Sequence, residues 1–246
     1  MRFDVITLFP DMIQSVMNES ITGRAIKKGC LSVYCHQLRD FAVDKHNRVD
    51  DTLYGGGKGM LLMAKPLADC FESICSKLNK KPYLIYPSPK GKILNQEKIK
   101  ALSKYENIAL VCGHYEGIDE RFIETYVDEQ ISIGDYVLTG GELPALIIMD
   151  SISRMVPGVL SDEECYKEES HFNGLLECPH YTKPQVWKNK AVPEVLTNGN
   201  HALIYKWRRE QSLMITAKNR PDMLKDAELS QEDIEFLNSI KQNLDE

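Results

Sequence analysis

Residues 82–111, PYLIYPSPKGKILNQEKIKALSKYENIALV, hold two short apolar runs separated by a stretch with helical character. The runs Pro82–Tyr86 and Asn107–Val111 have the length of strands, and Asn95–Lys104 between them is predicted to be a helix that Asn95 caps. A strand, a helix and a strand at this spacing pair the two strands in parallel. The stretch therefore predicts an α/β fold built on a parallel sheet.

The residues on either side continue the alternation of strands and helices. Further strands are expected at Arg2–Phe9, which Pro10 ends, and at Ser32–Gln37. Apolar side chains at helical spacing, caps and stop signals predict the helices. These are a short helix that Asp11 caps, Thr22–Lys28 stopped by Gly29, Lys65–Lys77, and Glu142–Val156 ended by Pro157-Gly158.

Two stretches interrupt this pattern. Arg39–Gly59 is long, polar and without clear periodicity, and a loop of that length inside a domain is usually functional. Val159–Phe172 is acidic and is predicted to be a linker. Beyond it, Asn200 is expected to cap a helix to about Thr216, and Ser230 to open a last helix. We expect an α/β domain over 1–158, a linker over 159–172 and a small all-helical domain over 173–246.

Composition narrows the class of protein. The chain has 246 residues, 43% of them hydrophobic, which suffices for a packed core. Residues 1–6 lack the features of a signal peptide, and no apolar run has the length of a membrane span, so we expect a cytoplasmic protein without a membrane partner. The seven cysteines form no C-x-x-C pair, and Cys178-Pro179-His180 has no second ligand pair nearby. A disulfide framework and a zinc site are both disfavoured.

Charge is distributed unevenly along the chain. The formal net charge is −6, but residues 221–246 hold eight acids and two lysines, which leaves the rest neutral overall. Residues 201–220 carry Lys206, Arg208, Arg209, Lys218 and Arg220 against Glu210 alone. Such a patch suits a phosphate backbone, and it equally suits a solvated basic helix face.

Three segments combine glycine with polar or aromatic residues: Tyr54–Gly59, Gly113–Arg121 and Ile133–Pro144. The last two are expected at the carboxyl ends of parallel strands, where open α/β sheets bind ligands. The first lacks the G-x-x-x-x-G-K-[ST] spacing of a P-loop, and no G-x-G-x-x-G follows the first strand. A nucleoside triphosphatase and an ordinary dinucleotide-binding domain are therefore disfavoured.

A set of motifs spans nearly the whole chain, and Gly113–Arg121 and Ile133–Pro144 are the most specific of them. The others are Leu8-Phe9-Pro10, Thr22-Gly23-Arg24-Ala25, Arg39-Asp40-Phe41, Val49-Asp50-Asp51, Tyr54-Gly55-Gly56-Gly57, Pro157-Gly158-Val159-Leu160, Gly174-Leu175-Leu176, Cys178-Pro179-His180-Tyr181, Gly199-Asn200-His201 and Gln211-Ser212-Leu213. On these motifs the chain resembles the tRNA (guanine-N1)-methyltransferase (TrmD) family of the SPOUT superfamily. The resemblance implies methylation of N1 of the guanine at tRNA position 37, adjacent to the anticodon, with S-adenosylmethionine as methyl donor.

The resemblance also implies a fold and an assembly. The N-terminal α/β domain would form a deep trefoil knot, against the general rarity of knots, and the chain would be a homodimer with each active site at the subunit interface. The family holds its cofactor largely by backbone, which implies contacts from Tyr86, Pro87, Ser88, Gly113, Tyr115, Glu116, Gly117, Ile133, Gly134, Asp135, Tyr136, Val137, Leu138, Gly140, Gly141 and Pro144. Pro87 stands where the family usually has leucine, so a contact through its carbonyl survives and one through an N–H does not.

Three residues are implied as catalytic. Guanine N1 carries a proton at neutral pH, so transfer needs a base, which the family places in the linker. The matching residue is Glu169, where the family usually has aspartate, and Glu168 is a weaker candidate. Arg154 would stabilise the charge that develops on guanine O6. Glu116 would complement the sulfonium or hold Mg²⁺, although the sequence shows no cage of carboxylates.

Without the family resemblance, the residues at these positions are consistent with other roles. Glu168 and Glu169 are also consistent with solvated charges of the linker, and Arg154 is consistent with a helical ion pair with Asp150.

Residues expected to contact RNA are Arg39, Asp40, His46, Arg48, Asp50 and Lys58 in the polar loop, and Lys206, Arg208 and Arg209 in the basic helix. Trp207 suits either RNA contact or a core position. The alternatives to the main prediction are a SPOUT methyltransferase that acts on another RNA, and a non-catalytic RNA-binding module.

Overall fold

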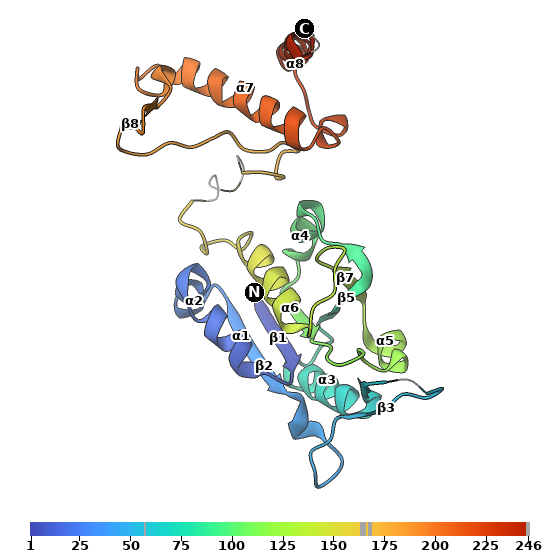
Figure 1. The fold of residues 1–246 in the computed structure, drawn as a ribbon. Coiled ribbons are helices and arrows are strands. Elements are labelled where there is room, and N and C mark those ends of the chain that lie inside the picture. Colours follow the sequence, from blue (N-terminus) through green and yellow to red (C-terminus); the bar gives the residue numbers. More distant parts are fainter. Residues whose placement is uncertain (57, 163–165, 167–168, 245–246) are drawn as a thin grey trace. The chain divides into compact units, whose positions relative to one another are not determined.

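The computed structural model describes residues 1–56, 58–162, 166 and 169–244, with the backbone alone for 241–244. The chain forms two compact units, Met1–Glu163 and Glu164–Glu246 (Figure 1). The division falls inside the stretch predicted to be a linker. Residues 163–165, 167 and 168 of that stretch lie outside the described residues.

The first unit is built on a five-stranded sheet in the order β2-β1-β6-β5-β7, and every strand pair in it is parallel. The strands are β1 (Arg2–Thr7), β2 (Ser32–Gln37), β5 (Tyr83–Ile93), β6 (Asn107–Val111) and β7 (Glu129–Ser132). The predicted α/β class with a parallel sheet is confirmed. The β5-helix-β6 unit at its centre is the one that residues 82–111 predict.

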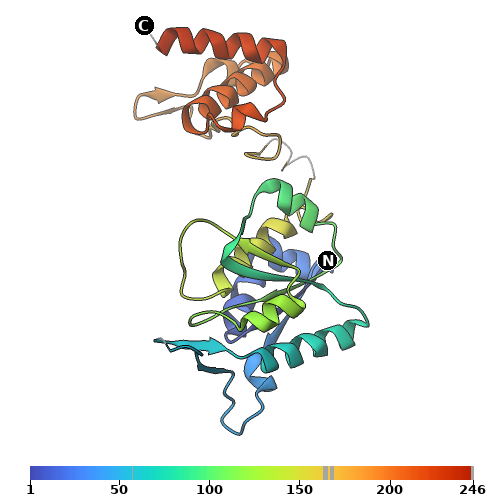
Figure 2. The ribbon, with the colours of Figure 1, turned by 90° about the vertical axis from the view of Figure 1, so that its right-hand side faces the viewer.

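Helices cover both faces of this sheet. Along β6, Ile108 and Leu110 contribute to one hydrophobic cluster, whereas Ala109 and Val111 contribute to the other. The alternation follows from the two-residue period of a strand, and parallel strands buried on both faces are apolar throughout. One face is covered by α1 (Pro10–Met17), α2 (Ser20–Lys27), α4 (Gln96–Leu102) and α6 (Glu142–Ser153), and the other by α3 (Ala64–Leu78) and α5 (Glu120–Tyr126) (Figures 1 and 2).

The helix caps show which local signals the sequence carried. Asn95 accepts a hydrogen bond from the backbone N–H of Lys98, so the predicted cap of α4 is confirmed. The predicted cap at Asp11 is wrong, because α1 begins one residue earlier at Pro10 and has no side-chain cap. Proline suits this first position, where its missing N–H is not needed. The sequence also missed α5 and β7, which are short and polar.

The polar stretch 39–59 is more ordered than predicted. It contains a 3-10 helix, η1 (Leu38–Phe41), and the strand β3 (Asp50–Thr52), which pairs antiparallel with β4 (Met60–Leu62). Val49 before the hairpin is fully buried and anchors the loop to the core. The expectation of an irregular loop therefore holds only for its outer parts, which project from the edge of the unit (Figures 1 and 2).

A buried carboxylate ties β1 to β2. Asp4 is fully buried, and its oxygens accept from His36 Nε2 at 2.8 Å and from two Arg2 guanidinium nitrogens at 2.7 and 2.9 Å. Burial raises the pKa of Asp4, but the hydrogen bonds from His36 and Arg2 outweigh burial and leave this pKa below its ordinary value. A lowered pKa in the folded state means that the ionised form stabilises the fold.

Replacing Asp4 by asparagine is expected to lower the free energy of unfolding at pH 7 by about 3 kcal/mol, because Arg2 and His36 lose a buried partner. The difference in the free energy of unfolding between the wild type and Asp4→Asn is fully present above the pKa of an unfolded aspartate, about 3.9. It shrinks as pH falls through the lower pKa that Asp4 has in the folded state. Urea unfolding between pH 7 and pH 3 measures it. The matched control is Asp69→Asn, which breaks the exposed Lys65–Asp69 pair and should cost under about 1 kcal/mol. Equal losses in both variants would contradict this account of Asp4.

The second unit contains α7 (His201–Asn219) and α8 (Gln231–Leu244), with the 3-10 helices η3 (Glu194–Leu196) and η4 (Met223–Lys225). Leu175, Leu213 and Leu237 form its small core. Asn200 caps α7 by accepting from the backbone N–H of Leu203, as predicted. The prediction of an all-helical region is wrong in one respect, because β8 (Val186–Trp187) and β9 (Lys190–Ala191) form a hairpin. Two-residue strands are too short to give a periodic signal.

No helix in the parts of the chain that the structure describes has both the length and the apolar character needed to cross a bilayer.

Candidate active site

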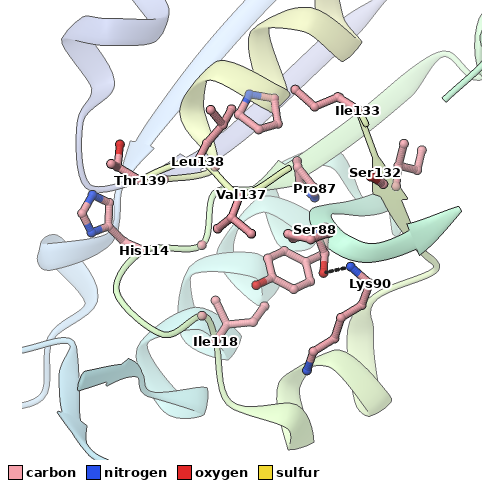
Figure 3. A pocket seen from close by; sticks show the side chains of 18 of the residues that line it. Pro87, Ser88, Lys90, His114, Ile118, Ser132, Ile133, Val137, Leu138 and Thr139 are labelled. Atoms are coloured by element: carbon pink, nitrogen blue, oxygen red, sulfur yellow. Dashed lines mark hydrogen bonds between the residues drawn. The ribbon is translucent and has the colours of Figure 1, made fainter. Parts of the chain in front are cut away.

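A cavity of about 310 Å³ opens at the carboxyl ends of β6 and β7, beside a bulge within β5 (Figure 3). This is the edge of an open parallel sheet at which ligands bind. Every residue predicted to contact the cofactor lines it except Asp135, which is exposed in the same loop but outside the cavity wall. The lining residues that the sequence predicts are Tyr86, Pro87, Ser88, Gly113, Tyr115, Glu116, Gly117, Ile133, Gly134, Tyr136, Val137, Leu138, Gly140, Gly141 and Pro144.

The first wall comes from a bulge in β5. Pairing with β7 shifts register between Pro87 and Lys92, so the intervening residues leave the ladder. Pro87 has no N–H to donate to a neighbouring strand, which favours a bulge at this point. Ser88 is buried, and its hydroxyl accepts from the backbone N–H of Lys90 at 3.2 Å, as Figure 3 shows. The bulge thereby presents a polar side chain to the cavity within an apolar surround.

The other walls are the loop after β6 and the loop between β7 and α6. They are joined directly: the backbone N–H of Gly141 donates to Gly113 O at 2.8 Å, and His114 and Gly140 form an antiparallel bridge. Figure 3 places Val137 and Leu138 of the second loop across the cavity from Lys90. Two loops distant in sequence thus form one continuous wall.

Gly141 is required by the closeness of these loops. A Cβ built on it would lie 2.7 Å from both Cys112 Cα and Gly113 N, which are backbone atoms that cannot move aside alone. Replacing Gly141 by alanine is expected to displace the loop and to weaken binding of the cofactor that the resemblance implies, S-adenosylmethionine, about tenfold, a loss of about 1.4 kcal/mol. Isothermal titration calorimetry on the folded variant measures this. Wild-type affinity in Gly141→Ala would show that the loop contact does not shape the cavity.

A buried carboxylate fastens the start of α6 to β1. Glu142 is 2% exposed, and its Oε1 accepts from the hydroxyl of Thr7, itself fully buried, at 2.7 Å. The same hydroxyl accepts from the backbone N–H of Phe9 at 2.9 Å. These bonds fix the point at which the 133–141 loop enters α6. Sequence reasoning missed this role, because a glutamate in the first turn of a helix is usually solvated.

The β3–β4 hairpin is hydrogen-bonded to the cavity loop. Leu62 N donates to Gly117 O at 3.1 Å, Glu116 N donates to Met60 O at 3.0 Å, and Asp119 N donates to Leu62 O at 2.9 Å. The side chain of Glu116 lies over Gly59, where an added Cβ would come within 2.6 Å of Oε1. The polar stretch expected to meet RNA is therefore held against the loop expected to meet the cofactor.

The RNA-binding candidates of the first unit lie on or beside that stretch. Arg39, Asp40, His46, Arg48 and Lys58 are exposed, and Asp50 is half-buried in β3. Arg39 donates to Asn47 O at 3.2 Å, and Arg48 pairs with Asp44 at 2.6 Å. In the second unit, Lys206 and Arg208 are exposed on α7, whereas Arg209 forms a two-bond ion pair with Asp233 of α8. Arg209 thus joins two helices, and its contact with RNA stays a prediction.

The catalytic candidates lie in different units. Arg154 is half-buried at the C-cap of α6, and its backbone N–H donates to Asp150 O at 3.2 Å. Glu169 is half-buried in a turn of the second unit, where Phe172 N donates to Glu169 O at 3.3 Å. Glu168, the weaker candidate for the base, lies outside the described residues. The assignments of Arg154, Glu169 and Glu116 stay predictions.

Among the described residues, no three His, Cys, Asp or Glu side chains are grouped so as to hold a metal ion. Glu116 is therefore in no such group within that part of the chain, and its proposed role toward Mg²⁺ stays a prediction.

Sequence reasoning missed several residues of the cavity wall. They are Pro89, Lys90, His114, Ile118, Glu120, Ile123, Ile131, Ser132 and Thr139. His114 and Thr139 fall within the two glycine-rich motifs, each directly beside a glycine. That position was the signal in the sequence that could have identified them as residues of the cavity wall. The Nδ1 of His114 is buried and has no hydrogen-bond partner within the described part of the chain. Such a group is normally satisfied by a ligand or by water.

An open parallel sheet with a ligand cavity where two glycine-rich loops meet defines an α/β protein that binds a small molecule at its strand ends. The model of the family "tRNA (Guanine-1)-methyltransferase TrmD" matches residues 1–226. This chain belongs to that family.

Named relatives agree over almost the full chain. A tRNA (guanine-N(1)-)-methyltransferase of Ruminiclostridium cellulolyticum is 55% identical over 91% of this chain and 96% of its own length. The enzyme of the same name from Clostridioides difficile is 52% identical over 92% and 98%, and that of Alkaliphilus oremlandii is 48% identical over 98% and 99%. The resemblance stated from the motifs is confirmed.

Proposed function

We propose that this chain is a tRNA methyltransferase that transfers the methyl group of S-adenosylmethionine to N1 of the guanine at tRNA position 37. Membership of the family supports the reaction class. The observation that supports the site most directly is the cavity at the strand ends, where the residues expected to bind the cofactor gather from three separate segments. The proposal of position 37 rests on the family resemblance.

The cavity suits a cofactor of this chemistry. Its volume of about 310 Å³ lies at the lower end of the range for small-molecule sites, about 300 to 1,000 Å³. Apolar side chains such as Ile118, Leu138 and Pro144 line it together with buried hydroxyls of Ser88 and Ser132. Backbone N–H and C=O groups of the glycine loops add polar contacts without bulky side chains. The bound cofactor supplies an electrophilic methyl carbon attached to a sulfonium.

The chain's own residues then have two tasks. As N1 of guanine bonds to the methyl carbon and the carbon–sulfur bond breaks, the N1 proton must leave, and we assign Glu169 as the carboxylate that takes it. Negative charge develops on O6 as the proton leaves. We assign Arg154 to stabilise that charge, because a guanidinium is permanently charged and can donate two parallel hydrogen bonds.

We also propose a knotted chain, a homodimer and a cytoplasmic location for this protein. The proposal of a knotted chain rests on the family resemblance. Exposed apolar side chains on α1, on α6 and directly before α1, namely Met12, Val16, Leu143, Ile147 and Phe9, support a homodimer through this face. The second unit is proposed to bind tRNA through its basic helix, with the linker supplying the base. A cytoplasmic location suits a tRNA substrate.

Methyl transfer to unmodified tRNA tests the proposal. The full chain is incubated with tRNA carrying guanine at position 37 and with methyl-labelled S-adenosylmethionine, and the digested nucleosides are separated. The expected product is 1-methylguanosine. Label on a ribose or on another base would establish a related methyltransferase instead, and saturable tRNA binding without label would establish a non-catalytic RNA-binding module.

A further inference from the structure

The second unit exposes a tryptophan that its own core does not use. Trp187 in β8 is 58% exposed, and Val186 beside it is 58% exposed. All residues from 181 to 190 are exposed. Large aromatic side chains usually pack in a core or serve at an interface, because they bury more apolar area than other residues. This segment therefore has the character of a contact surface.

Its charge indicates the chemistry of the partner. Residues 181–191 contain Lys183, Lys188 and Lys190 and no aspartate or glutamate, although the whole chain is net negative. The Nζ of Lys188 lies 4.7 Å from the centre of the Trp187 ring. Lys188 and Asn189 both have positive φ, which places them at the tight turn between β8 and β9. One cation thus lies over an exposed aromatic ring at the tip of a hairpin, and two further lysines belong to the same segment.

The hairpin is connected to the basic helix. The Tyr181 and Trp207 rings lie 6.3 Å apart, which joins the segment before β8 to α7. Figure 1 shows the hairpin beside the amino-terminal end of α7. Arg208 next to Trp207 is exposed, whereas Arg209 is held by Asp233. We call Tyr181, Lys183, Trp187, Lys188, Lys190 and Arg208 the hairpin surface.

We infer that the hairpin surface binds an unpaired nucleotide of the tRNA substrate, with its base stacked on Trp187 and its neighbouring phosphates on the lysines. Exposed aromatic rings among cations are the means by which proteins hold single-stranded nucleic acid. Exposed aromatic rings also serve protein interfaces, but the family acts on tRNA, which favours a nucleotide as the partner. The inference rests on the proposed function only in taking tRNA as the partner.

Tryptophan fluorescence tests the contact, because the chain has only two tryptophans. In the Trp207→Phe variant, Trp187 is the sole reporter, and titration with unmodified tRNA is expected to quench it saturably. In the Trp187→Phe variant, the quench should be lost. Stacking is lost in Trp187→Ala, which is expected to raise the Kd and KM for tRNA about tenfold. The affinity for S-adenosylmethionine and kcat at saturating tRNA should not change.

A matched pair of lysine variants tests the electrostatic part. Lys188→Gln should weaken tRNA binding and reduce the slope of log Kd against log salt by about 0.7 to 0.9, the value for one phosphate contact. Lys225→Gln removes an exposed lysine of the same unit on η4 and should leave both quantities unchanged. An equal effect in both variants would overturn the assignment of the hairpin surface and indicate only a general effect of charge.

The outcomes separate this inference from the proposed function. If the wild type forms 1-methylguanosine while folded Trp187→Ala keeps the wild-type Kd and KM for tRNA, the inference that the hairpin surface binds tRNA is wrong and the proposed function stands. If Trp187 is quenched by tRNA but no methyl group is transferred, the hairpin surface stands and the proposed function fails. Quenching by phosphatidylserine vesicles but not by tRNA would overturn the inference in favour of a lipid surface.

Discussion

Replacing Glu169 by glutamine is expected to lower kcat for tRNA methylation by about a hundredfold to ten-thousandfold, the usual contribution of a general base. Glutamine has nearly the same shape as glutamate but cannot take a proton. The turn that Glu169 closes with Phe172 through its backbone carbonyl should persist. Single-turnover kinetics with saturating S-adenosylmethionine and tRNA measure the change directly.

Three comparisons make the result specific to Glu169. Glu169→Asp should retain much of the activity, because aspartate is the residue that the family usually has. Glu177→Gln, a change to an exposed carboxylate of the same unit, should be neutral. Glu168→Gln tests the weaker candidate. Normal turnover in Glu169→Gln would rule Glu169 out as the base, and a collapse confined to Glu168→Gln would transfer the role to that residue.

Replacing Arg154 by lysine is expected to lower kcat by about a hundredfold. Lysine keeps the positive charge but loses the planar pair of donors that can follow the developing charge on guanine O6. Because the side chain stands at the C-cap of α6, the helix itself should form normally in the variant. Rapid-quench kinetics separate the chemical step from tRNA binding, whose Kd should change little.

The competing role for Arg154 is a helical ion pair with Asp150, four residues earlier. Such a pair contributes only about 0.2 to 0.5 kcal/mol, which is about a twofold effect. Asp150→Asn is the matched control, because it would remove that pair and leave Arg154 in place. If Asp150→Asn and Arg154→Lys lowered kcat equally, Arg154 would have a structural role only.

The parts of the fold that the sequence predicted correctly depend on local signals. The continuous apolar run of β6 and the asparagine caps of α4 and α7 are encoded within a few residues of where they act. The strand β7 has only four residues, and it forms through pairing with β5. A bulge in β5, which the sequence does not predict, interrupts that pairing. The hairpin β3–β4 likewise forms through pairing and through the bonds that Leu62 makes with the 117–119 loop.

The same distinction holds for the site. The motifs located the two glycine-rich loops, but the cavity exists because those loops meet, and that contact depends on Gly141 approaching the backbone of Cys112. His114 and Ser132 were missed because their place in the wall comes from contacts between segments. Glu142 was missed because its burial depends on Thr7, 135 residues away in sequence. Distant contacts of this kind leave no periodic signal in the chain.

Reverse transcription of tRNA after reaction tests the central claim most directly, because a methyl group on N1 of guanine blocks Watson–Crick pairing. The substrate is unmodified tRNA with guanine at position 37, and the same tRNA with adenine at that position is the control. We predict a stop directly before position 37 that requires both S-adenosylmethionine and the wild-type chain and is absent from the control. Full-length copies from the guanine substrate, with S-adenosylmethionine bound and the chain folded, would contradict the account.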